Sequence, residues 1–215
     1  MIREVKSPNA PSSLSEQKKY DGQDVLDQLF IDHHEKCYLC ELKVKQHYQV
    51  EHLKSKENFS ALKYEWANLF LSDDYCNGKK SANFDEILTP DDNNIEDIIE
   101  QRIDSINRKA LFKSAIDSVP VQKTIELLNR IFNGTYVPKL RRKREDEFFK
   151  EVERSINAFN MTLLNYLIDP NPQTEKAVRD ELSIDKELLG FKYWIIKDHA
   201  ELFLVFGKDI IWNKR

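Results

Sequence analysis

The sequence predicts an α+β fold in which most residues are helical. Charged residues make up 33% of the chain and glycine accounts for only 5 of its 215 residues, a composition typical of a helix-rich, solvated protein. Between residues 44 and 80, short alternating and apolar segments instead indicate strand, loop, strand and helix in that order. We therefore expect a small mixed core with a larger helical companion.

Three regions follow from this pattern. Residues 1–21 contain Pro8, Pro11 and several serines, which predict an irregular N-terminal arm. Residues 22–82 form the predicted core, with a helix at 22–35, strands at 44–50 and 66–71, and a short helix opening at Cys76. Residues 83–215 form a predicted helical C-terminal region. Its helices are expected at 95–106, 121–132 and 142–168 and from Asn171 onward, followed by an apolar tail at 188–212.

Charge and cysteine content restrict the class of protein. The formal charge of −4 excludes a generally basic protein that coats nucleic acid, although a local basic groove is compatible with it. The chain has neither a signal-peptide core nor an apolar run of about 18 residues, so we expect no membrane segment. Its three cysteines, two of them in a C-x-x-C pair, fit metal binding in a reducing compartment better than disulfides. We therefore expect a cytoplasmic protein.

The cysteines predict a structural zinc site. Cys37 and Cys40 form the C-x-x-C pair, and Cys76 follows after 35 intervening residues. A C-x-x-C turn lets two thiolates face one tetrahedral ion at about 2.3 Å. The fourth ligand would be Asp73, three positions before Cys76, with His47 or a water as alternatives. The competing interpretation is that the pair consists of two small buried side chains.

A second group of residues predicts hydrolytic chemistry. A neutral imidazole such as that of His52 takes a proton from water at cellular pH. Glu51 and Asn77 offer oxygen ligands, which suit Mg²⁺ or Mn²⁺ better than zinc. Nearby lysines supply positive charge for a phosphate backbone: Lys54, Lys56, Lys79 and Lys80. Taken singly, a Glu-His pair is usually solvated surface and Asn68 is an ordinary turn cap; taken together, they favour a phosphodiester site.

These residues carry a resemblance to a known family. The order C-x-x-C, EH, W-x-NL and CN-x-x-K over residues 37–80 resembles the signature of the HNH endonucleases, whose core is the ββα-metal fold. The resemblance implies His52 as general base, Glu51 and Asn77 as catalytic metal ligands, and Asn68 as the asparagine that braces the loop. It also implies Lys80 as a phosphate contact and the three cysteines as zinc ligands. Two positions depart from the family pattern: Glu51 replaces the commoner Asp, and Asp73 replaces a zinc cysteine.

A softer resemblance covers more of the chain. The N-terminal arm, the W-x-NL-x-LS segment and the TIELLN…KLRRKRE stretch are similar to the PtuB-type HNH nucleases of Septu and retron antiphage systems. This similarity implies an effector nuclease that works with a PtuA-like ATPase, and with a reverse transcriptase and its msDNA if the chain is retron-associated. Its implied substrate is nucleic acid, with DNA first and RNA such as tRNA second.

Several alternatives stay open at this point. The basic run at 139–144 either contacts phosphates or is the solvated start of a helix, and the tail at 188–212 either joins the core or docks a partner. The rival function is a zinc-stabilised adaptor whose nuclease site has decayed. A transcription regulator is disfavoured because the sequence shows no helix-turn-helix pattern.

Overall fold

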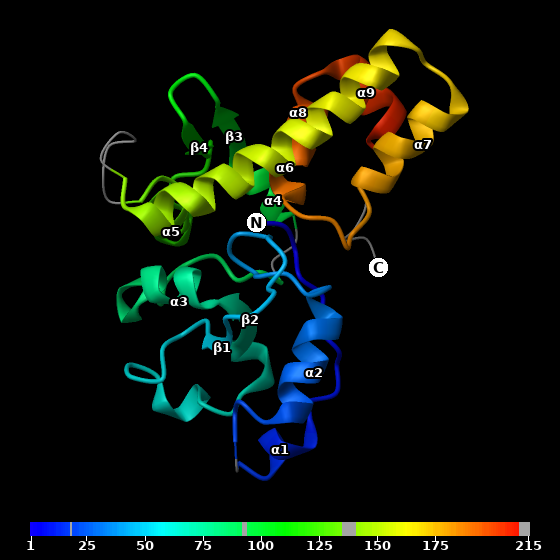
Figure 1. Cartoon of the computed structure of the whole chain (residues 1–215). Helices are drawn as coiled ribbons and strands as arrows, with labels where there is room; N and C mark the ends of the chain where they lie inside the picture. The colour runs from blue at the N-terminus through cyan, green and yellow to red at the C-terminus, as the bar shows by residue number, and fades with distance from the viewer. Residues whose placement is uncertain (18, 92–93, 135–140, 211–215) are drawn as a thin grey trace.

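The computed structural model describes residues 1–17, 19–91, 94–134 and 141–210 (Figure 1). The fold is mixed α+β and mostly helical, with 50% helix, 11% strand and two small antiparallel hairpins. This confirms the predicted fold class at the level of secondary-structure content.

The N-terminal arm packs against the rest of the chain. It contains a single helical turn, α1 (Ser12–Ser15), and its Met1, Ile2 and Leu14 side chains are buried. The next helix, α2 (Gln23–Asp32), starts after Gly22 and buries Val25 and Leu29 one turn apart, as the amphipathic pattern predicts.

A strand, loop, strand and helix follow in the predicted order. Strand β1 (Tyr48–His52) pairs antiparallel with β2 (Leu69–Asp73), and helix α3 (Asp74–Lys80) begins directly after β2. Both strands lie a few residues later than predicted. For the second strand the reason is a 3₁₀ turn at Trp66–Asn68, which occupies the predicted start of that strand. Helix α3 packs on this hairpin (Figure 1).

The helix predicted at 95–106 is wrong. The chain forms one helical turn, α4 (Ile95–Ile98), and then a hairpin of β3 (Glu100–Asp104) and β4 (Lys109–Lys113). The isoleucines recur at helical spacing, but only Ile95 and Ile98 lie in α4, and Ile103 lies in β3, where a β-branched side chain packs well on a pleated surface. The turn itself is fixed by the Asp104 carboxylate, which accepts the Asn107 backbone N–H at 2.9 Å and leaves Ile106 94% exposed.

The remaining helices are α5 (Val119–Asn133), α6 (Lys143–Ile168), α7 (Pro172–Glu181), α8 (Leu189–Lys197) and α9 (Ala200–Phe206). Helices α5, α6 and α7 agree with the predicted positions within a few residues, whereas the apolar tail contains two helices, α8 and α9, whose positions were not predicted. Helix α6 buries one stripe from Phe149 to Leu163 at the expected spacing. Among the described residues, no helix has the length and apolar character needed to cross a membrane.

Two hydrophobic clusters hold these elements together. The larger cluster extends from Met1 through the β1–β2 hairpin to α5, α6 and Phe191, so it crosses both predicted region boundaries, at 21/22 and at 82/83. The smaller cluster joins the second half of α6 to α7, α8 and α9. Helix α8 buries Tyr193 and Trp194 in the smaller cluster and Phe191 in the larger one, which favours the interpretation of the apolar tail as core. Residues 211 and 212 of this tail lie outside the described residues.

Candidate metal centre and catalytic site

The three cysteine side chains converge in the interior. Cys37 and Cys40 lie in a tight turn in which the Cys37 N–H donates to the Leu42 carbonyl at 3.0 Å, and Cys76 reaches them from α3. All three are buried, and their sulfur atoms lie within 4.8 Å of one another. Three soft donors this close and shielded from water can hold a metal such as zinc.

The protonation of the thiols fits a cation at their centre. Burial opposes ionisation of Cys37, but hydrogen bonds from the Cys40 and Cys76 thiols hold the pKa of Cys37 well below its ordinary value. Burial raises the pKa of Cys40 and Cys76. A cation bound by the three sulfur atoms would take the place of the thiol protons.

Asp73 lies next to the cluster but caps a helix. Its Oδ1 accepts the Tyr75 backbone N–H at 2.8 Å at the start of α3, and burial raises its pKa to about 6. Within the described part of the chain, the group of mutually close metal donors contains the cysteines alone. A pocket of about 210 Å³ is lined by Cys40, Asp73 and Arg144, so solvent or a side chain can approach the cluster from this side. The fourth zinc ligand stays a prediction.

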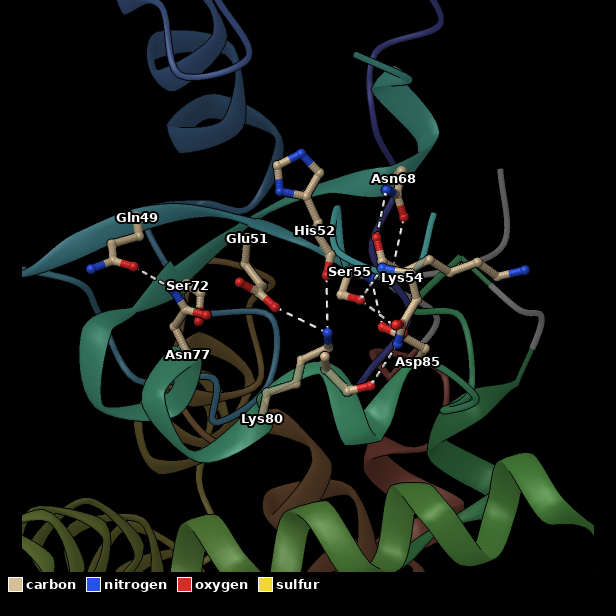
Figure 2. Close-up of polar contacts among 12 residues, drawn as sticks. Gln49, Glu51, His52, Lys54, Ser55, Asn68, Ser72, Asn77, Lys80 and Asp85 are labelled. Atoms are coloured by element: carbon tan, nitrogen blue, oxygen red, sulfur yellow. Dashed lines mark hydrogen bonds and ion pairs between the residues drawn. The ribbon is translucent and has the colours of Figure 1, made fainter. Parts of the chain in front are cut away.

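Strand β1 and helix α3 are joined by three polar contacts, two of them between side chains. Alternate residues of a strand share a face, so Gln49 and Glu51 both point toward α3. The Asn77 amide donates to the Gln49 side-chain oxygen, and the Lys80 ammonium lies 3.0 Å from Glu51 Oε1 (Figure 2). Glu51 and Asn77 thus both lie at the contact between β1 and α3, each paired with a residue of the other element.

Lys80 has interior partners. Only 1% of its surface is exposed, and its Nζ also donates to the His52 backbone carbonyl at 2.9 Å. Burial raises the pKa of Glu51, and the Lys80 ammonium opposes that rise. In this arrangement Lys80 balances the charge of Glu51 and ties α3 to β1; the predicted phosphate contact of Lys80 stays a prediction.

His52 points to the other side of strand β1. It is the last residue of the strand, and its ring lies away from the Glu51 carboxylate (Figure 2). Its Nε2 is 3.0 Å from the Lys63 carbonyl oxygen, and the ring of Tyr20 meets it edge-on at 4.7 Å. A carbonyl oxygen only accepts hydrogen bonds, so Nε2 carries the proton and Nδ1 is the basic nitrogen. Burial lowers the pKa of His52, which keeps the ring neutral at cellular pH.

Asn68 braces the loop between the strands. Its Oδ1 accepts the Lys54 N–H at 2.8 Å, and its Nδ2 donates to the carbonyls of Lys54 at 3.0 Å and Leu62 at 3.2 Å (Figure 2). The amide therefore closes both ends of the loop at residues 53–67 and holds the segment that carries the Lys63 carbonyl. This is the position that the sequence predicts for a bracing asparagine.

Three members of this site are not indicated by the sequence. Asp85 accepts hydrogen bonds from the Ser55 N–H at 2.5 Å and the Asn58 amide at 2.7 Å, so it anchors the same loop from outside the motif. Tyr20 reaches His52 from the N-terminal arm. The period-two pattern of β1 places Gln49 on the Glu51 face and could have identified it, whereas no local pattern indicates Asp85 or Tyr20.

The predicted basic residues have mixed surroundings. Lys56 is exposed, and its ammonium donates to the Tyr20 hydroxyl at 2.9 Å. In the run at 139–144, Arg144 pairs with Asp74, and Arg141 donates to the Arg108 carbonyl at 3.2 Å. Lys139 lies outside the described residues. This use of the run in internal contacts favours its interpretation as the start of α6.

No protein-family model matches the chain, and no curated protein matches it. The resemblance to HNH endonucleases therefore stays a prediction that depends on the motif residues and on the arrangement described above.

Proposed function

We propose that this protein is a metal-dependent endonuclease of the HNH type that hydrolyses phosphodiester bonds in nucleic acid. The observation that carries the proposal is the hydrogen bond from His52 Nε2 to the Lys63 carbonyl, because it leaves Nδ1 as a base on a neutral ring. The hairpin β1–β2 followed by α3 supports it, since Glu51, His52, Asn68 and Asn77 occupy the elements that the HNH pattern assigns to them.

Each residue has a distinct role in the proposed reaction. His52 Nδ1 takes a proton from water as the water oxygen attacks phosphorus opposite the departing 3′ oxygen. The 3′ oxygen takes up a proton from solvent, so the products are a 5′-phosphate and a 3′-hydroxyl. Asn68 holds the loop that fixes the imidazole, and Lys80 opposes the rise in the pKa of Glu51. Glu51 and Asn77 would hold Mg²⁺ or Mn²⁺, an ion that supplies charge neutralisation at the phosphate when bound. The three thiols would hold zinc as a structural ion.

The proposal includes the cellular context that the PtuB-type resemblance implies. The protein would act in the cytoplasm on DNA, or on RNA such as tRNA, together with a PtuA-like ATPase in antiphage defence. The observation that favours the rival adaptor is the Lys80 ammonium, because it already neutralises the carboxylate that a catalytic cation would need.

Cleavage assays separate these functions. Wild type is compared with His52→Ala and with His199→Ala, an exposed histidine just before α9, on plasmid DNA and on total tRNA with Mg²⁺ or Mn²⁺. We expect His52→Ala to lose cleavage by about 100-fold or more, as for a general base, while His199→Ala keeps it. Equal cleavage by wild type and His52→Ala contradicts the mechanism. Absence of any cleavage by folded, metal-loaded wild type, with and without the ATPase, supports the adaptor.

A further inference from the structure

Lysines and aromatic rings alternate beside His52. We define the lysine–aromatic platform as six residues from the N-terminal arm and the β1–β2 loop: Tyr20, Lys54, Lys56, Phe59, Lys63 and Tyr64. The Lys54 ammonium lies 5.3 Å from the centre of the Phe59 ring, and the Lys56 ammonium lies 4.9 Å from that of Tyr20. The Lys63 ammonium lies 5.7 Å from the Tyr20 ring and 5.0 Å from the Tyr64 ring.

The platform borders the proposed base directly. Tyr20 contacts the His52 ring edge-on at 4.7 Å, and the backbone of Lys63 supplies the carbonyl that accepts from Nε2. A strand held on the platform therefore passes within reach of the imidazole.

The aromatic rings of the platform are held by packing and by an ordered loop, and each stays partly exposed to solvent. Tyr20 and Tyr64 pack one side against the main hydrophobic cluster, while Phe59 is 38% exposed and Lys54 and Lys56 are exposed. Asn68 and Asp85 hold the loop that carries these side chains. A ring fixed in this way binds a planar partner without losing much side-chain freedom, which favours binding.

We propose that the platform binds unpaired nucleotides, with bases stacked on Tyr20, Phe59 and Tyr64 and phosphates near the three lysines. Every base presents a π face, so such a surface takes single strands of any sequence, whereas paired bases inside a duplex are not available to stack. The inference rests on the proposed function, since it assigns single-stranded nucleic acid as the substrate class of the same site.

Binding without catalysis tests the platform. Fluorescence anisotropy without added Mg²⁺ or Mn²⁺, with a labelled 16-nucleotide single strand and with the matching duplex, measures affinity independently of cleavage. Phe59→Leu keeps an apolar side chain of similar size but removes the π face. We expect it to weaken single-strand binding about 5- to 100-fold, the range for loss of one stacked base. Phe203→Leu is the matched control, because Phe203 on α9 is 40% exposed; it should bind as wild type does.

The lysines give a second, independent measurement. Lys54→Gln with Lys56→Gln should lower the slope of log affinity against log salt by about 1.4, since each phosphate contact on a single strand contributes about 0.7. Wild-type affinity in Phe59→Leu, equal weakening in Phe203→Leu, or tighter binding of the duplex would each overturn the platform. Loss of cleavage in His52→Ala with binding retained leaves it standing, so the two proposals fail separately.

Discussion

His33 is a histidine that the fold keeps neutral. It is fully buried at the end of α2, its ring centre is 5.7 Å from that of Phe70, and neither ring nitrogen has a hydrogen-bond partner among the described residues. Burial, with a smaller contribution from the nearby Lys6 ammonium, lowers the pKa of His33 to about 3. Its imidazole therefore acts as an apolar ring in the folded chain.

This burial predicts a pH-dependent stability. The unfolded chain protonates His33 below its ordinary value of 6.5, while the folded chain stays neutral down to about 3. The contribution to folding is thus present above pH 6.5 and is lost as pH falls, at about 1.4 kcal/mol per pH unit. We expect the free energy of unfolding to fall between pH 7 and pH 5, and to fall by about 2 kcal/mol less in His33→Leu than in wild type. Urea unfolding at the two pH values measures this difference. The same pH response in both would contradict the assignment; exposed His47→Leu should respond like wild type.

At the scale of elements, the β1–β2 loop depends on one amide. Asn68 makes all three of its hydrogen bonds to the loop backbone, at both of its ends. Asn68→Ala leaves the Lys54 N–H without its partner, so we expect a loss of unfolding free energy of about 1–3 kcal/mol, together with weaker cleavage. Asn68→Asp keeps the acceptor for that N–H and should lose less. In urea unfolding, Asn157→Ala serves as the control, because Asn157 is exposed on α6. Equal stability of Asn68→Ala and wild type would contradict the bracing role.

The cysteine cluster predicts one metal ion per chain. Elemental analysis of purified protein should find zinc, and a chelator should release it, lower the melting temperature and expose three thiols to a colorimetric thiol reagent together. The count is clear because the chain contains only three cysteines. Cys76→Ser should lose the metal, while Ser72→Ala, whose hydroxyl lies 3.7 Å from the Cys37 sulfur, should retain it. The prediction is contradicted if the purified protein contains no metal and the chelator leaves its melting temperature unchanged.

At the scale of the whole molecule, buried hydrogen bonds connect the cysteine turn to the C-terminal region. Lys36 is fully buried, and its ammonium donates to the carbonyls of Ile184 at 2.6 Å and Lys186 at 3.1 Å. On the other side of the turn, the Glu41 carboxylate accepts the Gly190 N–H at 3.0 Å. Burial lowers the pKa of Lys36, and Glu4 and Glu41 oppose this change.

Removing this connection should destabilise both halves. Lys36→Met leaves two buried carbonyl acceptors unpaired, so we expect a loss of about 1–3 kcal/mol in the free energy of unfolding. Lys45→Met is the matched control, since Lys45 is exposed and pairs with Glu151 at 3.5 Å; its change should stay within about 0.5 kcal/mol. Calorimetry provides the comparison. Similar melting of the two variants would show that the contact contributes little.

The sequence predicts local secondary structure better than the tertiary contacts between elements. The alternation around Val50 and the apolar stripe of α6 both reflect short-range physics, and these elements were predicted near their observed positions. The isoleucines from Ile95 to Ile106 recur at helical spacing, but a β-branched residue such as Ile103 also favours a strand. The opposite directions of Glu51 and His52 follow from strand geometry, but the interior pairing of Lys80 depends on tertiary packing that no local spacing encodes.

The Lys36 contact also bears on how the polypeptide is made. Its acceptor carbonyl on Ile184 is 148 residues further along the chain. Ribosomes release the N-terminal part first, at about 5–20 residues per second, so Lys36 waits several seconds or more for its partner. During that interval the cysteine turn lacks its C-terminal partners. Translation speed therefore becomes part of the folding problem of this protein.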